Sequence, residues 1–255
     1  MIFAFANQKG GVGKTTTAVT LADGLARLKR RTLLVDLDPQ GHVALSFGLE
    51  KSPGLYRLIC LDEPLSAVVQ TVRPNLDVVP GDKQTEKVKR QITLADFRET
   101  ILSDLLATAE YEAVLLDMAP SLDVLHINGL IAADWVIIPT RLDALAVDGV
   151  NEILTTMAEI SRNGHHYRGY SILPTFFDRT TRETLLQFEE ITRVFGSSVW
   201  PPVPQDTRVR ETVAYGQTLW EYSPDSSSVA GFTEGHQYLG GYRQVLGKLL
   251  EVLDG

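Results

Sequence analysis

The N-terminal end of the chain contains a run of glycines and lysines with the composition and spacing of a phosphate-binding loop. Residues 9–16 read KGGVGKTT and follow the apolar run 2–6, which has the length of a β-strand. Glycines let the backbone turn its N–H groups toward phosphate oxygens, and the N-terminus of a following helix adds the positive end of its dipole. In this pattern Lys14 contacts the β- and γ-phosphates, and the Thr15 hydroxyl binds Mg²⁺.

One position departs from the standard pattern G-x-x-x-x-G-K-[ST]. Gln8 replaces its first glycine, and a second lysine, Lys9, stands next to it. A glycine-rich turn can also be a tight loop with no ligand, and for a lone G-x-G that alternative is favoured. A seven-residue match placed between a strand and a helix favours the phosphate loop.

Aspartates follow two further apolar runs. Residues 32–36 (TLLVD) end on Asp36, with Asp38 two positions later, and residues 113–117 (AVLLD) end on Asp117. Aliphatic and β-branched runs of this length are typical of buried parallel strands. The carboxyl ends of such strands meet at one edge of the sheet, where the carboxylate of Asp117 would hold a Mg²⁺-bound water. Turn-forming aspartates before Pro39 are the alternative for the first pair, but their place after the phosphate loop disfavours it.

These side chains require a framework of short strands alternating with helices. Strands are predicted at 2–6, 32–36, 76–79, 113–117, 136–139 and 170–175, and helices at 15–28, 94–109, 148–160 and 234–253. Residues 42–75 are predicted to be short helices and loops that cover one end of the sheet. This order predicts an α/β fold with a doubly wound, mostly parallel sheet flanked by helices. We expect a single domain, 1–255, because the length allows one sizeable core.

Composition limits the classes of partner and compartment. The net charge of −8 opposes nucleic acid at long range, so DNA binding would need a local basic patch. The single cysteine, Cys60, excludes an internal disulfide framework. No apolar run is long enough to span a membrane, and no signal peptide precedes Ile2. We therefore expect a cytoplasmic protein.

The motifs together resemble those of the ParA/MinD family of P-loop ATPases, whose phosphate loop is a deviant Walker A box. KGGVGKT matches that box, DLDPQG at 36–41 resembles the A′ motif, and DMAPSL at 117–122 resembles D-x-P-P-S-L with Ala119 in place of the first proline. The resemblance implies that Lys9 crosses an ATP-sandwich homodimer to contact the ATP held by the other subunit. It also implies that Asp38 orients or activates the attacking water and that Asp36 supports the Mg²⁺ shell.

The same resemblance gives a full set of predicted site residues for the cofactors ATP and Mg²⁺. The predicted catalytic residues are Lys9, Lys14 and Asp38. The predicted metal site consists of Thr15, Asp36, Asp38 and Asp117. The predicted nucleotide contacts are Lys9, Gly10, Gly11, Val12, Gly13, Lys14, Thr15, Thr16, Thr175, Pro204, Gln205 and Asp206.

Two later segments resemble the DNA-binding regions of ParA proteins. FDRTTR at 177–182 resembles Y-D-x-R-T, and PQDTRVRE at 204–211 resembles P-x-x-x-R-x-x-E. The resemblance implies a non-specific DNA surface made by Arg208, Arg210, Arg182 and Arg179. Two alternatives stay open: the arginines could pair with neighbouring acids, or the basic run 83–90 could be the contact surface rather than a solvated face.

The resemblance implies a ParA-type partitioning ATPase that associates with the nucleoid and releases it when a cargo-bound adaptor stimulates hydrolysis. The cargo could be a plasmid, a chromosome or a carboxysome-like body. No helix-turn-helix precedes the first strand, so no operator-specific regulation is expected. A MinD-like membrane-cycling ATPase is the alternative, but it needs a basic amphipathic C-terminal helix, and the last helix carries only Arg243 and Lys248 against Glu251 and Asp254. A relative of the nitrogenase iron protein would need cysteine ligands that this chain lacks.

Overall fold

A twisted seven-stranded sheet forms the centre of the computed structural model, which describes residues 1–234 and 237–255. The strand order is β3-β4-β2-β5-β1-β6-β7, and every neighbouring pair is parallel except β3 and β4. The strands are β1 (Ile2–Phe5), β2 (Thr32–Asp36), β3 (Gln70–Arg73), β4 (Leu76–Val79), β5 (Ala113–Asp117), β6 (Trp135–Arg141) and β7 (Gly169–Thr175). The predicted doubly wound, mostly parallel sheet is therefore confirmed.

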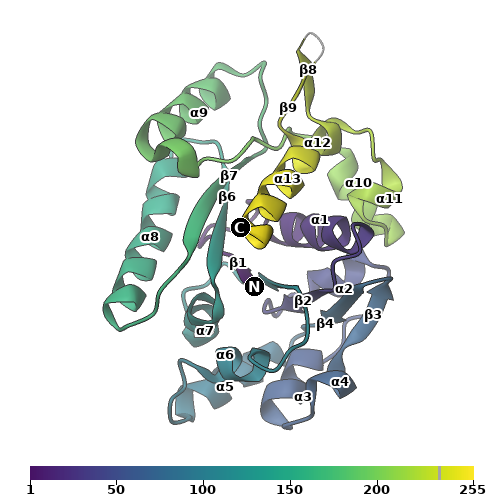
Figure 1. Ribbon diagram of the computed structural model, residues 1–255, viewed down its shortest axis with the longest axis vertical. Helices are drawn as coiled ribbons and strands as arrows, with labels where there is room; N and C mark the ends of the chain where they lie inside the picture. The colour runs from purple at the N-terminus through teal and green to yellow at the C-terminus, as the bar shows by residue number, and fades with distance from the viewer. Residues whose placement is uncertain (235–236) are drawn as a thin grey trace.

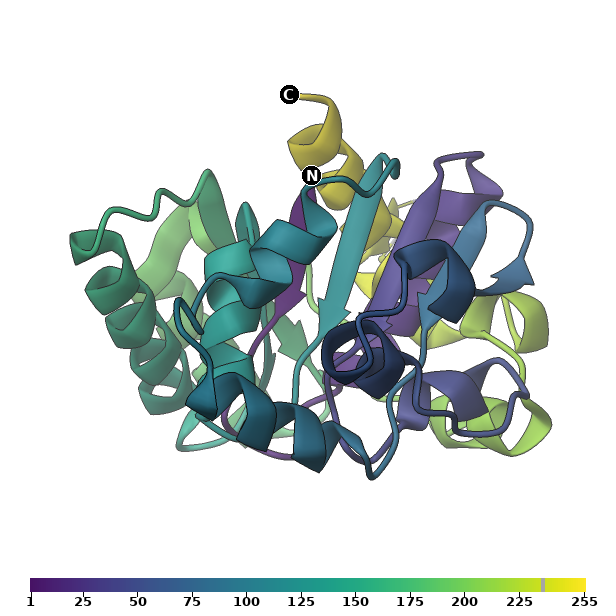
Figure 2. The ribbon, with the colours of Figure 1, turned by 90° about the horizontal axis from the view of Figure 1, so that it is seen from below.

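Helices cover both faces of the sheet (Figures 1 and 2). One core lies against α1 (Lys14–Arg27), α2 (His42–Ser46), α11 (Leu219–Tyr222), α12 (Ser227–Ala230) and α13 (Gly241–Asp254). The other core lies against α3 (Gly54–Cys60), α4 (Leu65–Val68), α5 (Thr85–Leu94), α6 (Ile101–Leu106), α7 (Val124–Ala132), α8 (Ala146–Arg162) and α9 (Arg182–Phe195). The short helix α10 (Arg208–Tyr215), the 3₁₀ turn Gly196–Ser198 and the hairpin of β8 (Phe232–Glu234) and β9 (Gln237–Leu239) complete the chain.

The central strands are apolar along their whole length because both faces are covered. Successive side chains of a strand point to opposite faces. Phe3 and Phe5 of β1 enter the core beneath α1, whereas Ala4 and Ala6 face the core beneath α7 and α8. All four are fully buried. This arrangement fixes β1 rigidly at the middle of the sheet, so the loop that follows it has a stable base.

The predicted helix 94–109 is wrong. Its residues divide between the end of α5 and the separate helix α6, and the side chains of Leu94 and Phe97 are 88% and 87% exposed. Phe97 has a φ of 51°, a left-handed conformation that a right-handed helix cannot contain. The apolar spacing combined the buried residues of α6 with Leu94 at the end of α5 and Phe97 in the intervening loop, and this produced the error.

The C-terminal helix is shorter than predicted, and the edge strand β3 and the two hairpin strands β8 and β9 were not predicted. Tyr238 and Leu239 lie in β9, and α13 starts at Gly241, because Gly240 and Gly241 both have positive φ values. Residues 235–236 of the predicted helix lie outside the described residues. Residues 70–73, which were predicted as loop, form the antiparallel edge strand β3. Such an edge strand has a mixed sequence that alternation alone does not distinguish from a loop.

The apolar face of α13 packs on its own chain. Tyr242, Val245, Leu246 and Leu249 are buried in the core that contains α1. A Cβ atom on Gly24 of α1 would lie 2.9 Å from Leu246, which shows how closely the two helices approach. Among the residues described, no helix combines the length and apolar character required to cross a membrane.

Candidate nucleotide-binding site

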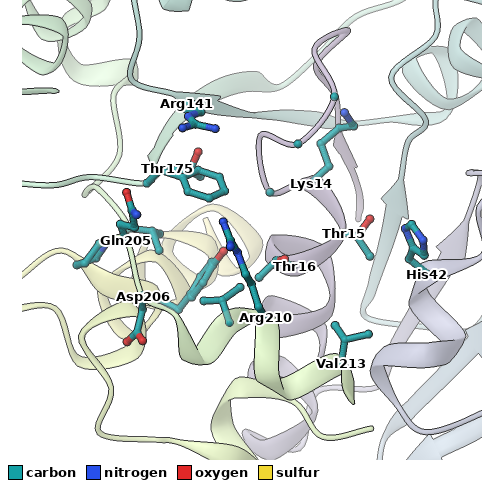
Figure 3. A pocket seen from close by; sticks show the side chains of 18 of the residues that line it. Lys14, Thr15, Thr16, His42, Arg141, Thr175, Gln205, Asp206, Arg210 and Val213 are labelled. Carbon is teal, nitrogen blue, oxygen red and sulfur yellow. The ribbon is translucent and has the colours of Figure 1, made fainter. Parts of the chain in front are cut away.

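A cavity of about 650 Å³ opens at the carboxyl edge of the sheet (Figure 3). The loops that follow β1, β2, β5, β6 and β7 contribute to its wall, together with α10 and α13. Its lining brings together residues far apart in the sequence, among them Gly10, Gly11, Gly13, Lys14, Thr15, Thr16, Asp38, His42, Pro120, Arg141, Thr175, Phe176, Pro204, Gln205, Asp206, Arg210, Val213 and Tyr242. This size and position are typical of a small-molecule site in an open α/β sheet.

The phosphate loop depends on left-handed glycines and on contacts from neighbouring strands. Gly11 and Gly13 have φ values of 72° and 89°, which side chains with a Cβ rarely adopt. The Thr175 hydroxyl at the end of β7 donates a hydrogen bond of 2.9 Å to the Val12 carbonyl. The Asn7 amide donates to the Pro139 carbonyl at 2.9 Å and its oxygen accepts from the Lys9 N–H. The loop is therefore held by contacts from the ends of β6 and β7 and from its own Asn7.

The Lys14 ammonium lies inside this loop. Its Nζ donates to the carbonyls of Asn7 at 2.8 Å and Lys9 at 3.1 Å. Burial lowers the pKa of Lys14 from its usual value, and the negative charges of Asp117 and Asp38 oppose that shift. Lys14 is thus a desolvated cation at the point where the sequence predicts the phosphates. The two loop carbonyls hold its ammonium there, and phosphate oxygens can replace them as acceptors.

Lys9 directly precedes Gly10, which lines the cavity, and its side chain is 40% exposed. Its Nζ forms an ion pair and hydrogen bond with the Asp143 carboxylate in the loop after β6. A half-exposed pair of this kind contributes about 0–1 kcal/mol to stability. Lys9 therefore has a partner within its own chain, and that partner can be exchanged at small cost.

Asp36 and Asp38 begin the loop after β2. Asp36 is fully buried and accepts backbone N–H bonds from Asp38 at 3.0 Å and Val43 at 3.2 Å. Burial and the neighbouring Asp117 raise the pKa of Asp36 well above its usual value, and the two N–H bonds oppose this shift. Asp38 reaches the cavity, and its Oδ1 accepts the Gln40 N–H at 2.8 Å. The first carboxylate shapes the loop, and the second faces the substrate space.

Asp117 provides the test of whether these residues fit Mg²⁺. Both carboxylate oxygens are buried, and neither has a hydrogen-bond partner among the residues that the structure describes. Burial raises the pKa of Asp117 to about 7; the nearby Thr15 hydroxyl and Lys14 oppose this shift, whereas Asp38 reinforces it. A bound cation would compensate this buried, unpartnered carboxylate. The residues therefore fit the ion.

The described residues contain no cluster of three histidine, cysteine or acidic side chains at metal-ligand spacing. Mg²⁺ keeps several water ligands and binds through one or two protein groups together with substrate phosphates. Thr15 and Asp117 are the groups that the geometry favours for these contacts. Both carboxylate oxygens of Asp36 accept backbone N–H bonds, so this residue could support the ion only indirectly, through its water ligands.

Comparison with known proteins agrees with this geometry. A family model described as an AAA domain matches residues 1–167. The chromosome-partitioning ATPase Soj of Thermus thermophilus is 37% identical over 225 residues, which cover 88% of each chain. The chain belongs to the ParA/Soj family of partitioning ATPases. It is therefore an ATPase, and its cofactors are ATP and Mg²⁺.

Solved structures support the same fold. Apo McdA from Cyanothece superposes with a TM-score of 0.80 at 20% identity and covers 88% of this chain and 93% of its own. Cobyrinic acid a,c-diamide synthase from Mycobacterium smegmatis, solved with an ATP analogue and magnesium, has a TM-score of 0.73 at 28% identity and covers 84% of this chain and 92% of its own. Both superpositions cover most of each chain.

The side of the cavity where a ParA/Soj protein is expected to hold adenine is formed by Thr175 and the segment 203–206. Pro204 pairs with Phe177 beside β7, and the Gln205 side chain is directed toward the cavity (Figure 3). The Asp206 carboxylate instead accepts hydrogen bonds from the Ser227 hydroxyl and from the backbone N–H groups of Ser228 and Arg208. Asp206 therefore lines the cavity, but its carboxylate is occupied elsewhere, and a nucleotide contact from this residue would come from its backbone.

Several lining residues were not predicted. His42 at the start of α2, Arg141 at the end of β6, Phe176 after β7, and Val213 of α10 all line the cavity. Arg141 and Phe176 follow the carboxyl ends of predicted parallel strands, so their position in the sequence was a usable signal. No sequence pattern distinguished Val213 or His42, because their approach depends on how short helices cross the edge of the sheet.

The four predicted DNA-binding arginines divide between two segments. Both segments leave the Phe177–Pro204 pairing, after which α9 and α10 lie on opposite sides of the β8–β9 hairpin (Figure 1). Of these four arginines, Arg208 alone has a carboxylate within 4 Å among the described residues, and that carboxylate is Asp206 at 3.9 Å. Arg179 stacks on the Phe232 ring at 4.7 Å, Arg182 is exposed at the start of α9, and Arg210 extends toward the nucleotide cavity (Figure 3).

The alternative basic run 83–90 is partly committed to internal contacts. Lys89 pairs with Glu86 at 3.1 Å and with Asp123 at 2.9 Å. Lys87 lies over the Tyr56 ring at 5.3 Å. Lys83 and Arg90 are exposed. The run therefore keeps Lys83 and Arg90 as exposed cations with no ion pair among the described residues, and it stays open as an alternative contact surface.

Proposed function

We propose that the chain is a ParA-type ATPase that positions a cargo on DNA. ATP joins two copies into a sandwich dimer, the dimer binds nucleoid DNA without sequence preference, and a cargo-associated adaptor stimulates hydrolysis. The whole chain, 1–255, acts as one domain in this cycle, in the cytoplasm and on the nucleoid. A plasmid or chromosome is the cargo that the partitioning relatives favour.

The position of Lys9 is the observation that carries this proposal. The lysine directly precedes Gly10, which lines the cavity, and among the described residues the carboxylate that its Nζ contacts is the partly exposed Asp143. A partly exposed ammonium beside the opening is available to a second molecule that closes over the same cavity. In that closed pair, Lys9 exchanges Asp143 for the phosphates held by the other subunit, and ATP becomes a condition for assembly.

The groups within one subunit account for the reaction. Lys14 leaves the carbonyls of Asn7 and Lys9 and binds phosphate oxygens, which a desolvated ammonium does strongly. Thr15 and Asp117 would hold Mg²⁺, which neutralises charge on the phosphates when bound. Asp38 has Oδ1 tied to Gln40, and we assign its other oxygen to the attacking water. Catalysis then consists mainly of positioning and charge stabilisation.

The exposed arginines would attach the dimer to DNA. Contacts from arginine to phosphate are independent of base sequence and weaken steeply with salt. Two copies bring six exposed arginines, Arg179, Arg182 and Arg208 of each, to one particle whose net charge is twice −8, so DNA binding would depend on these local contacts and not on the overall charge.

Retention on immobilised duplex DNA of random sequence tests this function. The protein should be retained with ATP and Mg²⁺ and released with ADP, at physiological ionic strength. Lys9→Gln should abolish the difference between the two nucleotides, whereas Lys29→Gln, an exposed lysine at the end of α1, should preserve it. Equal retention with ATP and ADP, or an unaffected Lys9→Gln variant, would contradict the proposal.

A further inference from the structure

Arg141 presents an unpaired guanidinium at the nucleotide cavity. Among the side chains that the structure describes, no carboxylate lies within the distance of a salt bridge and no acceptor takes a hydrogen bond from the Arg141 side chain. Its one close side-chain partner is the ring of Phe176, whose centroid lies 5.1 Å from Cζ. Arg141 is exposed, and among the described side chains nothing engages its five N–H donors except through the contact with Phe176, which places the guanidinium beside the phosphate loop.

An unusual backbone conformation fixes the ring that supports Arg141. Phe176 has a φ of 54°, which is strained for a bulky residue. The preceding residue, Thr175, is bonded to the Val12 carbonyl at 2.9 Å. A Cβ atom placed on Gly13 would lie 3.9 Å from Cε2 of Phe176, so the ring contacts the phosphate loop itself. The strained residue thus holds an aromatic platform between the loop and the guanidinium.

The platform places Arg141 on one particular side of the loop. Figure 3 shows Arg141 near Thr175, whereas Thr15 and His42 lie on the other side of the loop. Thr15, Asp38 and Asp117 mark the end where Mg²⁺ and the γ-phosphate are expected. Thr175 and the segment 203–206 mark the end where the base is expected. The phosphates nearest to Arg141 are accordingly those shared by ATP and ADP.

We propose that Arg141 binds the α- and β-phosphates of the nucleotide held by its own subunit, and that Phe176 orients it for this contact. A planar guanidinium can bind phosphate oxygens with two parallel hydrogen bonds. Stacking on the ring already restricts the side-chain rotamers, so the arginine loses less conformational entropy when phosphate binds. The proposal rests on ATP occupying this cavity, but it requires neither the dimer nor DNA.

The proposal predicts a contribution to binding that is equal for the two nucleotides. Arg141→Gln should raise the Kd for ATP and the Kd for ADP by the same factor, about tenfold to a hundredfold, as expected for the loss of charge-assisted hydrogen bonds. An interaction present in both the ground state and the transition state changes KM and leaves kcat almost unaltered. The KM for ATP should therefore rise by the same factor, with kcat within about twofold of the wild-type value.

Titration of fluorescent ADP and ATP into the full-length protein tests the proposal. Arg141→Lys keeps the charge but loses the planar fork, and Phe176→Leu removes the ring; both should give intermediate losses. Arg162→Gln removes an exposed arginine from the far end of α8 and should change neither affinity. Thermal unfolding of each variant establishes that it is folded. If Arg141→Gln does not fold, the Arg141→Lys variant provides the test.

Unchanged ADP affinity in Arg141→Gln and Arg141→Lys would overturn the proposal. A loss confined to ATP, together with a fall in kcat, would also overturn it, because that pattern places Arg141 at the γ-phosphate. ADP binding is measured here without a dimer, DNA or adaptor. A protein that binds ADP normally but is not retained on DNA would contradict the proposed function and leave the role of Arg141 intact.

Discussion

The phosphate-loop edge and the arginine segments at 177–182 and 204–210 differ in how their charged groups are held. At the edge, Lys14, Asp36 and Asp117 are buried, and rigid parallel strands position them. In the segments, Arg179, Arg182 and Arg208 are exposed on turns and at helix starts.

Buried charges are costly unless they have partners. The edge therefore commits the protein to one ligand class, phosphate with a cation. Exposed, loosely paired arginines carry no such commitment, and they suit a partner that is bound weakly and released. The contrast predicts large effects for single changes at the edge and small effects for single changes in the segments.

The largest expected effect belongs to Asp38→Ala. If Asp38 acts on the attacking water, its loss should lower kcat by about a hundredfold to ten-thousandfold. ATP affinity should change little, because phosphate binding depends on the loop and Lys14. Steady-state hydrolysis and fluorescent nucleotide binding, measured on the same preparation, separate the two effects. Undiminished turnover would remove Asp38 from the mechanism.

A smaller effect is expected in the exposed segments. Arg208→Gln should weaken ATP-dependent DNA retention and make the slope of log affinity against log salt shallower by about 0.9 for each DNA phosphate that Arg208 neutralises. ATP hydrolysis without DNA should stay at the wild-type rate. Arg90→Gln on α5 is the matched control, and it also tests the alternative basic run. If Arg90→Gln reduces retention and Arg208→Gln does not, the surface lies on 83–90.

The same contrast explains what could be predicted from the sequence. The ends of parallel strands converge, so aspartates at 36 and 117 could be placed near a phosphate loop before any coordinates were known. The predicted sheet is confirmed for this reason, whereas the roles of the individual site residues remain predictions. The segment at 95–97 shows a limit of apolar spacing, because an extended Ala95 and a left-handed Phe97 interrupt the expected helix.

Residues that meet through loop and helix crossings could not be predicted. Arg210 was assigned to DNA because the segment 204–211 is similar to a DNA-binding region, yet it extends toward the nucleotide cavity (Figure 3). The stack of Arg141 on Phe176 joins residues from two strand ends through an unusual φ value, which no local pattern encodes. Asp143 was not predicted as a partner of Lys9 for the same reason.

The most direct test of the account is the molar mass of the Asp38→Ala protein in solution, measured by light scattering at saturating Mg²⁺ with ATP and with ADP. We predict a particle of two 28.2 kDa chains with ATP and one chain with ADP. Adding Lys9→Gln to the same protein should return the ATP sample to one chain while nucleotide remains bound. A single chain at saturating ATP, or a pair that forms equally well without the Lys9 ammonium, would contradict the account.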